Sequence, residues 1–181
     1  MNFPRILKKR KGYIDRIKPF MQKSVVKVLT GQRRVGKSFL LYQLIEEILA
    51  KEPDANIIYV NLEDFTFSSL QTAEDLHSYI ISHSKEKVKN YIFIDEIQDI
   101  PGFEKVIRSL LLNEDNDIYI TGSNAKMLSG ELATYLSGRY IEFKIYSLSY
   151  SEFLEFHGLT ESETSYELYS RYGGLPYLLN L

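Results

Sequence analysis

The chain has 181 residues, of which 44% are hydrophobic and 25% are charged, and its formal net charge is -2. A chain of this length can form one well-packed globular domain with a small appendage, but not two full domains. The weak net charge gives no overall reason to expect nucleic acid or an anionic membrane as a partner. The absence of cysteine excludes disulfides, thiolate metal ligands and cysteine nucleophiles. No apolar run approaches the roughly 20 residues that span a bilayer, and the first residues lack a signal-peptide core, so we expect a cytoplasmic protein.

A basic cluster near the N-terminus consists of Arg5, Lys8, Lys9, Arg10 and Lys11. It could bind phosphate groups or an acidic partner, but a short run of charges is more often a solvated terminal segment. We therefore expect this cluster to be exposed and partly mobile.

Five runs of residues have the length and the β-branched or aromatic character of strands. Four of them are almost wholly apolar, as expected of strands buried on both faces: 25–29, 57–60, 91–94 and 118–120. In the fifth, 141–145, apolar and charged residues alternate, which predicts a strand with one exposed face near the edge of a sheet.

Helical patterns separate these strands at 39–49, 70–88 and 103–111. Because strands that alternate with helices form right-handed crossovers, we predict an α/β fold with a mostly parallel sheet covered by helices on both sides. We assign residues 1–146 to this core.

The character of the sequence changes at residue 147, where tyrosine and glutamate become frequent. We expect residues 147–181 to begin a helical lid, with short helices at 150–156 and 166–172. Because the chain ends inside an apolar segment, we also expect the parent protein to continue beyond it.

The strongest motif is G-x-x-x-x-G-K-S, which lies between a predicted strand and a predicted helix. A loop that wraps a polyphosphate with backbone N–H groups needs glycine where a β-carbon would block the close approach, here at Gly31 and Gly36. The helix that follows directs the positive end of its dipole at the same phosphates. Lys37 can reach the β- and γ-phosphates, and the Ser38 hydroxyl can bind magnesium. The predicted nucleotide-binding residues are Gly31, Gln32, Arg33, Arg34, Val35, Gly36, Lys37, Ser38 and Phe39.

Two carboxylates, Asp95 and Glu96, follow the predicted strand 91–94. Ligands of open α/β sheets bind at the C-terminal ends of the strands, which is where these acids lie. Asp95 is suited to hold magnesium, directly or through water, and Glu96 faces another direction and can polarise a water aimed at the γ-phosphate. Acids at a strand end can also merely cap a turn, but the phosphate-loop motif about 60 residues upstream favours the functional alternative.

The order of these motifs resembles that of the ASCE division of P-loop proteins, which includes AAA+ and STAND ATPases. A strand and a helix, 57–88, separate the phosphate loop from the acid pair, and a glutamate directly follows the aspartate. The sequence has no N-K-x-D guanine-binding motif, which argues against a GTPase.

A polar sensor residue follows the next strand in AAA+ proteins. Here the strand 118–120 is followed by Thr-Gly-Ser-Asn, so the resemblance makes Ser123 and Asn124 candidates for contact with the γ-phosphate or the attacking water. The sequence does not choose between them, and a plain polar turn with a positive φ angle at Gly122 is the alternative.

Arg139 precedes the fifth predicted strand. An arginine can neutralise the transition-state charge of a phosphate with two hydrogen bonds, and related ATPases often carry one at this position. A surface salt bridge is an equally good explanation for an arginine at this position. The two arginines inside the loop, Arg33 and Arg34, are expected to lie exposed around the site, because only the backbone there faces the ligand.

The tripeptide Gly174-Leu175-Pro176 resembles the G-x-P element of STAND ATPases, whose proline packs near adenine. Glycine and proline also end helices in unrelated proteins. Its position after the fifth strand therefore favours Pro176 as a nucleotide contact.

Together these segments resemble a family of bacterial and archaeal AAA+-like ATPases, from about residue 25 to the end of the chain. The resemblance rests on V-L-T-G-Q-R-R-V-G-K-S, I-F-I-D-E-I-Q, I-T-G-S-N-A, L-S-G-R-Y and Y-G-G-L-P-Y. It implies ATP binding and slow hydrolysis, and in that family a C-terminal winged-helix and nuclease-like region follows the ATPase domain. We predict a five-stranded, three-layer sandwich with strand order 5-1-4-3-2.

We therefore predict a magnesium-dependent ATPase whose hydrolysis of ATP drives a conformational change in an attached or partner domain. One alternative is a small-molecule kinase, which needs an acceptor pocket and an arginine-rich lid. The other is an ATP-sensing module without turnover, which the intact Lys37, Asp95 and Glu96 disfavour. Nucleotide is the expected partner and a membrane is not, while self-association and nucleic acid stay open.

Overall fold

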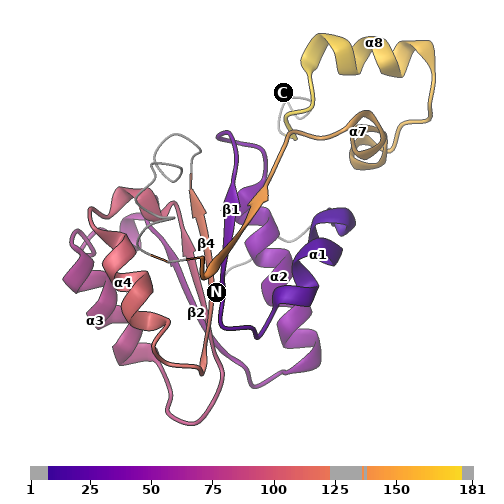
Figure 1. The fold of residues 1–181 in the computed structure, drawn as a ribbon. Coiled ribbons are helices and arrows are strands. Elements are labelled where there is room, and N and C mark those ends of the chain that lie inside the picture. The colour runs from indigo at the N-terminus through magenta and orange to yellow at the C-terminus, as the bar shows by residue number, and fades with distance from the viewer. Residues whose placement is uncertain (1–7, 123–135, 137, 177–181) are drawn as a thin grey trace.

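The computed structural model describes residues 8–122, 136 and 138–176, which form a sheet between two helical layers and a pair of helices beyond one edge of the sheet (Figure 1). No helix in this described part of the chain is long and apolar enough to cross a bilayer.

Five parallel strands form one sheet in the order β2-β3-β4-β1-β5. They are β1 (Val26–Thr30), β2 (Asn56–Asn61), β3 (Asn90–Asp95), β4 (Asn116–Gly122) and β5 (Tyr140–Lys144). The register places Thr30 beside Gly122 and Asn61 beside Asp95, so the C-terminal ends of the strands meet at one edge. The predicted fold class and strand order are confirmed.

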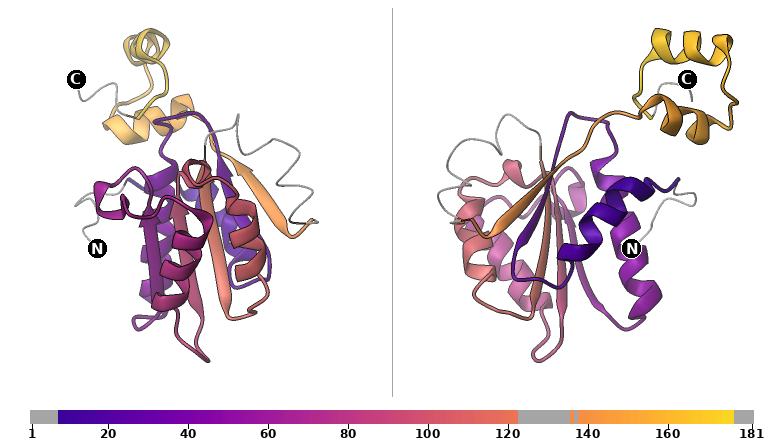
Figure 2. Two further views of the ribbon diagram at one scale, coloured as in Figure 1. Left: turned by 90° about the vertical axis from the view of Figure 1, so that its left-hand side faces the viewer. Right: turned by 45° about the vertical axis from the view of Figure 1, so that its right-hand side comes forward.

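Helices cover both faces of the sheet (Figure 1). On one face lie α1 (Lys11–Ile17) and α2 (Lys37–Lys51), and on the other lie α3 (Ala73–His83) and α4 (Phe103–Leu110). Single 3₁₀ turns lie at Lys18–Phe20, Phe65–Phe67 and Ile97–Asp99. After β5 come α7 (Tyr150–His157) and α8 (Glu163–Tyr172), which both views of Figure 2 place beyond the C-terminal ends of the strands.

Alternation along the strands divides the core into two clusters. In β3, Ile92 and Ile94 belong to the cluster with α3 and α4, whereas Tyr91 and Phe93 belong to the cluster with α1 and α2. A strand buried on both faces appears in the sequence as a continuous apolar run, which is why the three central strands β1, β3 and β4 could be predicted. The run 57–60 was predicted to be buried on both faces as well, but β2 lies at the other edge of the sheet and is only partly buried. The edge strand β5 alternates instead, with Phe143 buried between exposed neighbours, as predicted.

The bounds of α3 are narrower than the predicted 70–88. Thr72 and Asp75 form a capping box, in which each side chain accepts a hydrogen bond from the other residue's backbone N–H, and this starts the helix at Ala73. Ser84 has extended backbone angles and ends it.

Arg10, in the basic cluster near the N-terminus, is buried, whereas the sequence predicted that it would be solvated. The side chain of Arg10 is only 3% exposed, and α1, which the sequence analysis missed, buries Ile14 and Ile17 in the core. The charge of Arg10 is paired with Glu152, 142 positions away along the chain. A local charge pattern carries no information about such a distant partner, so the prediction of an exposed segment was wrong for Arg10.

Candidate functional site

The loop between β1 and α2 is shaped by two glycines. Gly31 has a φ angle of +153°, and a β-carbon there would lie 2.3 Å from the carbonyl oxygen of Ile145. Gly36, with a φ angle of +96°, is the N-cap of α2, and no side chain in the described part of the chain caps that helix. The amides of the first turn of this 15-residue helix are therefore left to an acceptor from outside the chain, as in an anion site.

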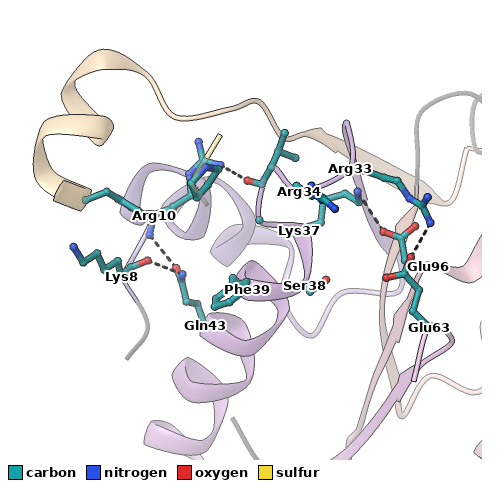
Figure 3. Close-up of a pocket in the computed structure, with 14 residues that line it drawn as sticks. Lys8, Arg10, Arg33, Arg34, Lys37, Ser38, Phe39, Gln43, Glu63 and Glu96 are labelled. Carbon is teal, nitrogen blue, oxygen red and sulfur yellow. Dashed lines mark hydrogen bonds and ion pairs between the residues drawn. The ribbon is translucent and has the colours of Figure 1, made fainter. Parts of the chain in front are cut away.

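Lys37 is buried at this helix start and folds back over the loop. Its ammonium group donates hydrogen bonds to the carbonyl oxygens of Gly31 and Gln32, each at 3.1 Å, and lies 3.3 Å from Oε1 of Glu96. The structure thus joins the loop to the second carboxylate of the acid pair. Figure 3 shows this ion pair at the wall of the cavity.

Asp95 ends β3 and is surrounded by hydroxyl groups. It accepts hydrogen bonds from Ser38 at the start of α2, from Thr121 of β4 and, at 3.3 Å, from Tyr59 of β2. Burial raises the pKa of Asp95 above its usual range, and the hydrogen bonds from Ser38 and Thr121 oppose that shift. A buried carboxylate of this kind gains from a nearby cation.

Glu96 adopts a left-handed backbone conformation, with a φ angle of +56°. Such a conformation is costly for a residue with a side chain, by about 1–3 kcal/mol, and it clusters at functional sites. Here the carboxylate forms an ion pair with Lys37. The other oxygen, Oε2, accepts a 2.6 Å hydrogen bond from Gln98, and the backbone N–H of Glu96 donates to Thr121 Oγ1 at 3.0 Å.

Lys37, Ser38 and Glu96 border a cavity of about 1070 Å³ at the C-terminal edge of the sheet. The cavity extends from the loop to α7, whose Phe156 lines it together with the half-exposed Phe39 of α2. The lining residues are Lys8, Arg10, Arg33, Arg34, Val35, Gly36, Lys37, Ser38, Phe39, Gln43, Glu63, Glu96, Phe156 and Pro176.

Most of the predicted nucleotide-binding residues line this one cavity. Gly31 and Gln32 contribute the carbonyls that hold Lys37, and Pro176 lies in the wall as expected. The side chain of Arg33 is 76% exposed and pairs with Glu63 at 2.9 Å, which agrees with the prediction that it surrounds the site.

A magnesium ion fits the donor set beside this cavity. Ser38 and Asp95 offer a hydroxyl and a carboxylate oxygen that already lie within hydrogen-bonding contact of one another. Magnesium keeps several waters and usually takes one or two protein oxygens together with phosphate oxygens, so these two groups suffice.

Not every predicted site residue lines this cavity, since among the described residues Gly31, Gln32, Asp95 and Arg139 do not. Ser123 and Asn124 lie outside the described residues. Arg139 is exposed, and its backbone carbonyl accepts a hydrogen bond from Val26 N, at the start of β1. It therefore lies at the opposite end of a five-residue strand from the loop, and it does not line the cavity.

Thr121, Tyr59 and Gln98 are site residues that the sequence analysis missed. Thr121 holds both members of the acid pair, because it bonds the carboxylate of Asp95 and the N–H of Glu96. A signal existed, since the C-terminal ends of neighbouring parallel strands meet at one edge and Thr121 is the penultimate residue of such a strand, β4. The residues predicted instead were the polar residues two and three positions later, Ser123 and Asn124.

Sequence similarity identifies the family to which this chain belongs. The profile of the AAA domain family matches residues 23–154, more than half of the chain. The chain belongs to the AAA domain family. Together with the fold, this supports a P-loop nucleotide-binding domain of the ATPase type.

This AAA domain has relatives in bacteria and archaea. It is 41% identical over 178 residues to an uncharacterized protein of Haemophilus influenzae, and 38% identical over 132 residues to the uncharacterized protein MJ1544 of Methanocaldococcus jannaschii. The matches cover 92% and 72% of this chain, but 43% and 28% of those proteins. The AAA domain thus spans less than half the length of the curated relatives it matches.

Solved structures share the fold of this AAA domain. The Hsp104:casein complex of S. cerevisiae has a TM-score of 0.64 at 15% identity, covering 94% of this chain and 35% of that chain. The Aeropyrum pernix ORC1 protein in complex with DNA has a TM-score of 0.58 at 14% identity, covering 91% and 51%. AMPPCP-bound DnaA from Aquifex aeolicus has a TM-score of 0.55 at 14% identity, covering 96% and 59%. At these identities the likeness concerns the fold alone.

Proposed function

We propose that this AAA domain binds ATP together with magnesium, hydrolyses it slowly, and uses the cycle to move an attached or partner domain. One observation carries the proposal. A helix start without a side-chain cap, a lysine and a carboxylate line a single cavity at the C-terminal edge of a parallel sheet, and a hydroxyl–carboxylate pair lies beside them. The absence of a guanine-binding motif from the sequence favours ATP over GTP.

The phosphates are proposed to bind at the loop and the first turn of α2. The free amides and the helix dipole would hold the β- and γ-phosphates, and Lys37 would turn from the carbonyls of Gly31 and Gln32 toward them. Ser38 and Asp95 would hold magnesium, which neutralises phosphate charge when it is bound.

Glu96 is the proposed general base. It would take a proton from a water whose oxygen attacks the γ-phosphorus, while the bond from that phosphorus to the β–γ bridging oxygen breaks and ADP leaves. Without nucleotide, Glu96 is paired with Lys37 and Gln98. A bound phosphate that attracts Lys37 would break the ion pair between Lys37 and Glu96. Nucleotide binding would thereby free the Glu96 carboxylate to act as the general base.

The base of the nucleotide is proposed to occupy the other end of the cavity, between Phe39, Phe156 and Pro176. These residues come from the core and from the segment after β5. A helical lid built on α7 and α8 could therefore sense whether nucleotide is present. The relatives are more than twice as long as this match, so a domain outside the match is the proposed recipient of the movement.

Two other functions are compatible with the same phosphate-binding loop. A kinase needs an acceptor and an arginine-rich lid, whereas residues 147–176 contain a single arginine, Arg171. A sensor without turnover does not need Glu96 held beside Lys37 at 3.3 Å. Both observations favour hydrolysis.

Product analysis separates the three functions. We expect incubation with ATP and magnesium to release free phosphate and ADP, and chelation of the metal to stop the release. A phosphorylated acceptor without free phosphate would instead identify a kinase. Tight binding with neither product would identify a sensor and refute the ATPase proposal.

Arg139 is proposed to act on the site of a neighbouring copy, since its own site lies at the opposite end of the strand. We expect phosphate release per chain to rise with protein concentration, and Arg139→Ala to lower the high-concentration rate by about tenfold or more. Arg108→Ala, an exposed arginine of α4, is the matched control. Rates that are independent of concentration and equal in both variants would remove Arg139 from the reaction.

A further inference from the structure

Arg10 is the most fully bonded side chain among the charged residues that line the cavity. A guanidinium carries five N–H donors. In Arg10, Nε and Nη2 donate to the two carboxylate oxygens of Glu152, both at 2.9 Å, and Nη2 also reaches the carbonyl of Ser147 at 3.4 Å. Nη1 donates to the carbonyls of Val35 at 3.1 Å and Tyr146 at 2.9 Å. All five donors are used, with a side chain only 3% exposed.

The acceptors of Arg10 belong to separate parts of the site. Val35 lies in the loop before α2, where its side chain is buried in the core. Tyr146 and Ser147 form the connection that leaves β5, and Glu152 lies in the first turn of α7. One side chain therefore ties the phosphate end of the cavity to the element that carries Phe156 at the other end.

The backbone around Arg10 is fixed independently of its side chain. The buried amide of Gln43 on α2 accepts a hydrogen bond from Arg10 N at 2.9 Å and donates one to the carbonyl of Lys8 at 3.0 Å (Figure 3). The ring of Tyr13 covers the guanidinium, with Cζ 4.5 Å from the ring centroid. The segment is thus anchored on the core, and the guanidinium reaches from it toward α7.

The start of α7 depends on the same carboxylate. Oε2 of Glu152 accepts the backbone N–H of Ser149 at 2.9 Å and closes the capping box that begins the helix. Burial alone would raise the pKa of Glu152, but the hydrogen bonds from Arg10 and from the Ser149 backbone hold that pKa below its ordinary value. Further along, the carbonyl of Gly174 accepts the N–H of Leu148 at 2.6 Å, which holds Gly174, two residues before Pro176, at the same connection.

We infer that Arg10 is a positioning residue that couples the phosphate-binding loop to the α7–α8 lid, through its contacts with the Val35 carbonyl and the Glu152 carboxylate. The inference rests on the proposed binding of ATP. With the bridge intact, the phosphate end and the base end of the cavity are held at a fixed separation, so a ligand that occupies both ends is bound by a preformed site. A ligand that occupies only the phosphate end gains nothing from the lid.

Lysine cannot replace Arg10 in this bridge. An ammonium has three donors around one nitrogen, and it cannot bond both carboxylate oxygens side-on while it also reaches carbonyls in two other segments. Arg10→Lys keeps the buried charge and so avoids leaving Glu152 unpaired, which makes it a milder test of the geometry than alanine.

The test compares two probes, MgATP and magnesium tripolyphosphate, on four forms of the chain. Glu152→Gln removes the charged acceptor on the lid but leaves the loop contact of Arg10. We expect it to weaken MgATP binding by about tenfold while tripolyphosphate affinity changes less than about twofold. Arg10→Lys should weaken both ligands, because it also disturbs the contact with Val35. Lys9→Ala, which removes a neighbouring exposed charge bonded to Glu47, should change neither.

The outcomes distinguish this inference from the proposed function. If the unaltered chain binds neither probe, ATP binding itself is refuted and the bridge with it. If it binds MgATP and Glu152→Gln binds both probes as tightly as Lys9→Ala does, only the role of Arg10 is refuted. Equal loss of both probes in Glu152→Gln, with a lower melting temperature, would show a merely structural role and also overturn the inference.

Discussion

Replacing Lys37 with alanine is expected to weaken MgATP binding by at least about 100-fold, because its buried ammonium lies at the loop and can turn directly onto the phosphates. Its present partners are two loop carbonyls and Glu96, all of which have other neighbours in the structure. Gln98 still donates to Glu96 after the change. The fold should therefore survive, and calorimetric titration beside a thermal melt measures both quantities.

A matched control removes the same charge from the same helix. Lys51→Ala lies in the last turn of α2, exposed and far from the loop, and we expect it to bind MgATP as the unaltered chain does. A stable Lys37→Ala protein with unchanged affinity would contradict the assignment of the loop to phosphate. Loss of the folded state in Lys37→Ala would be addressed with Lys37→Ala/Glu96→Gln, which removes the unpaired charge as well.

Local patterns were enough to predict the sheet. Three strands, β1, β3 and β4, are buried on both faces and therefore appear as apolar runs, and the alternation in β5 follows from its single exposed face at the edge. The apolar run of β2 predicted a strand but not its position at the other edge. The loop and the acid pair were predictable for a related reason. Their spacing in the sequence is dictated by the strand ends to which they belong, so Lys37, Ser38, Asp95 and Glu96 meet at one edge.

What could not be predicted depends on contacts between distant segments. The basic cluster gave no sign that Arg10 pairs with Glu152, and the short helix α1 has no side-chain cap among the described residues to announce its start. The pairing of Glu96 with Lys37 follows from a left-handed backbone at Glu96, a conformation that its residue type does not reveal. The register of β5 on β1 likewise decides that Arg139 faces away from its own loop, and a motif cannot show that.

The change from Glu96 to glutamine is expected to separate binding from hydrolysis. Glutamine has nearly the same shape and can still bond to Gln98, but it cannot accept a proton from water, so phosphate release should fall by about 100-fold or more. The ion pair with Lys37 is lost at the same time, which frees the ammonium for phosphate. We therefore expect MgATP affinity to be unchanged or a few-fold higher, by about 1 kcal/mol at most.

Single-turnover phosphate release and equilibrium titration on the same preparation measure the two effects separately. Glu114→Gln, an exposed carboxylate in the turn before β4, is the control for loss of one negative charge and should behave as the unaltered chain in both assays. Weaker binding by Glu96→Gln would mean that the carboxylate helps to hold the nucleotide rather than to activate water. Release at the unaltered rate would move the base to another residue, because a general base that has lost its proton acceptor cannot keep its rate.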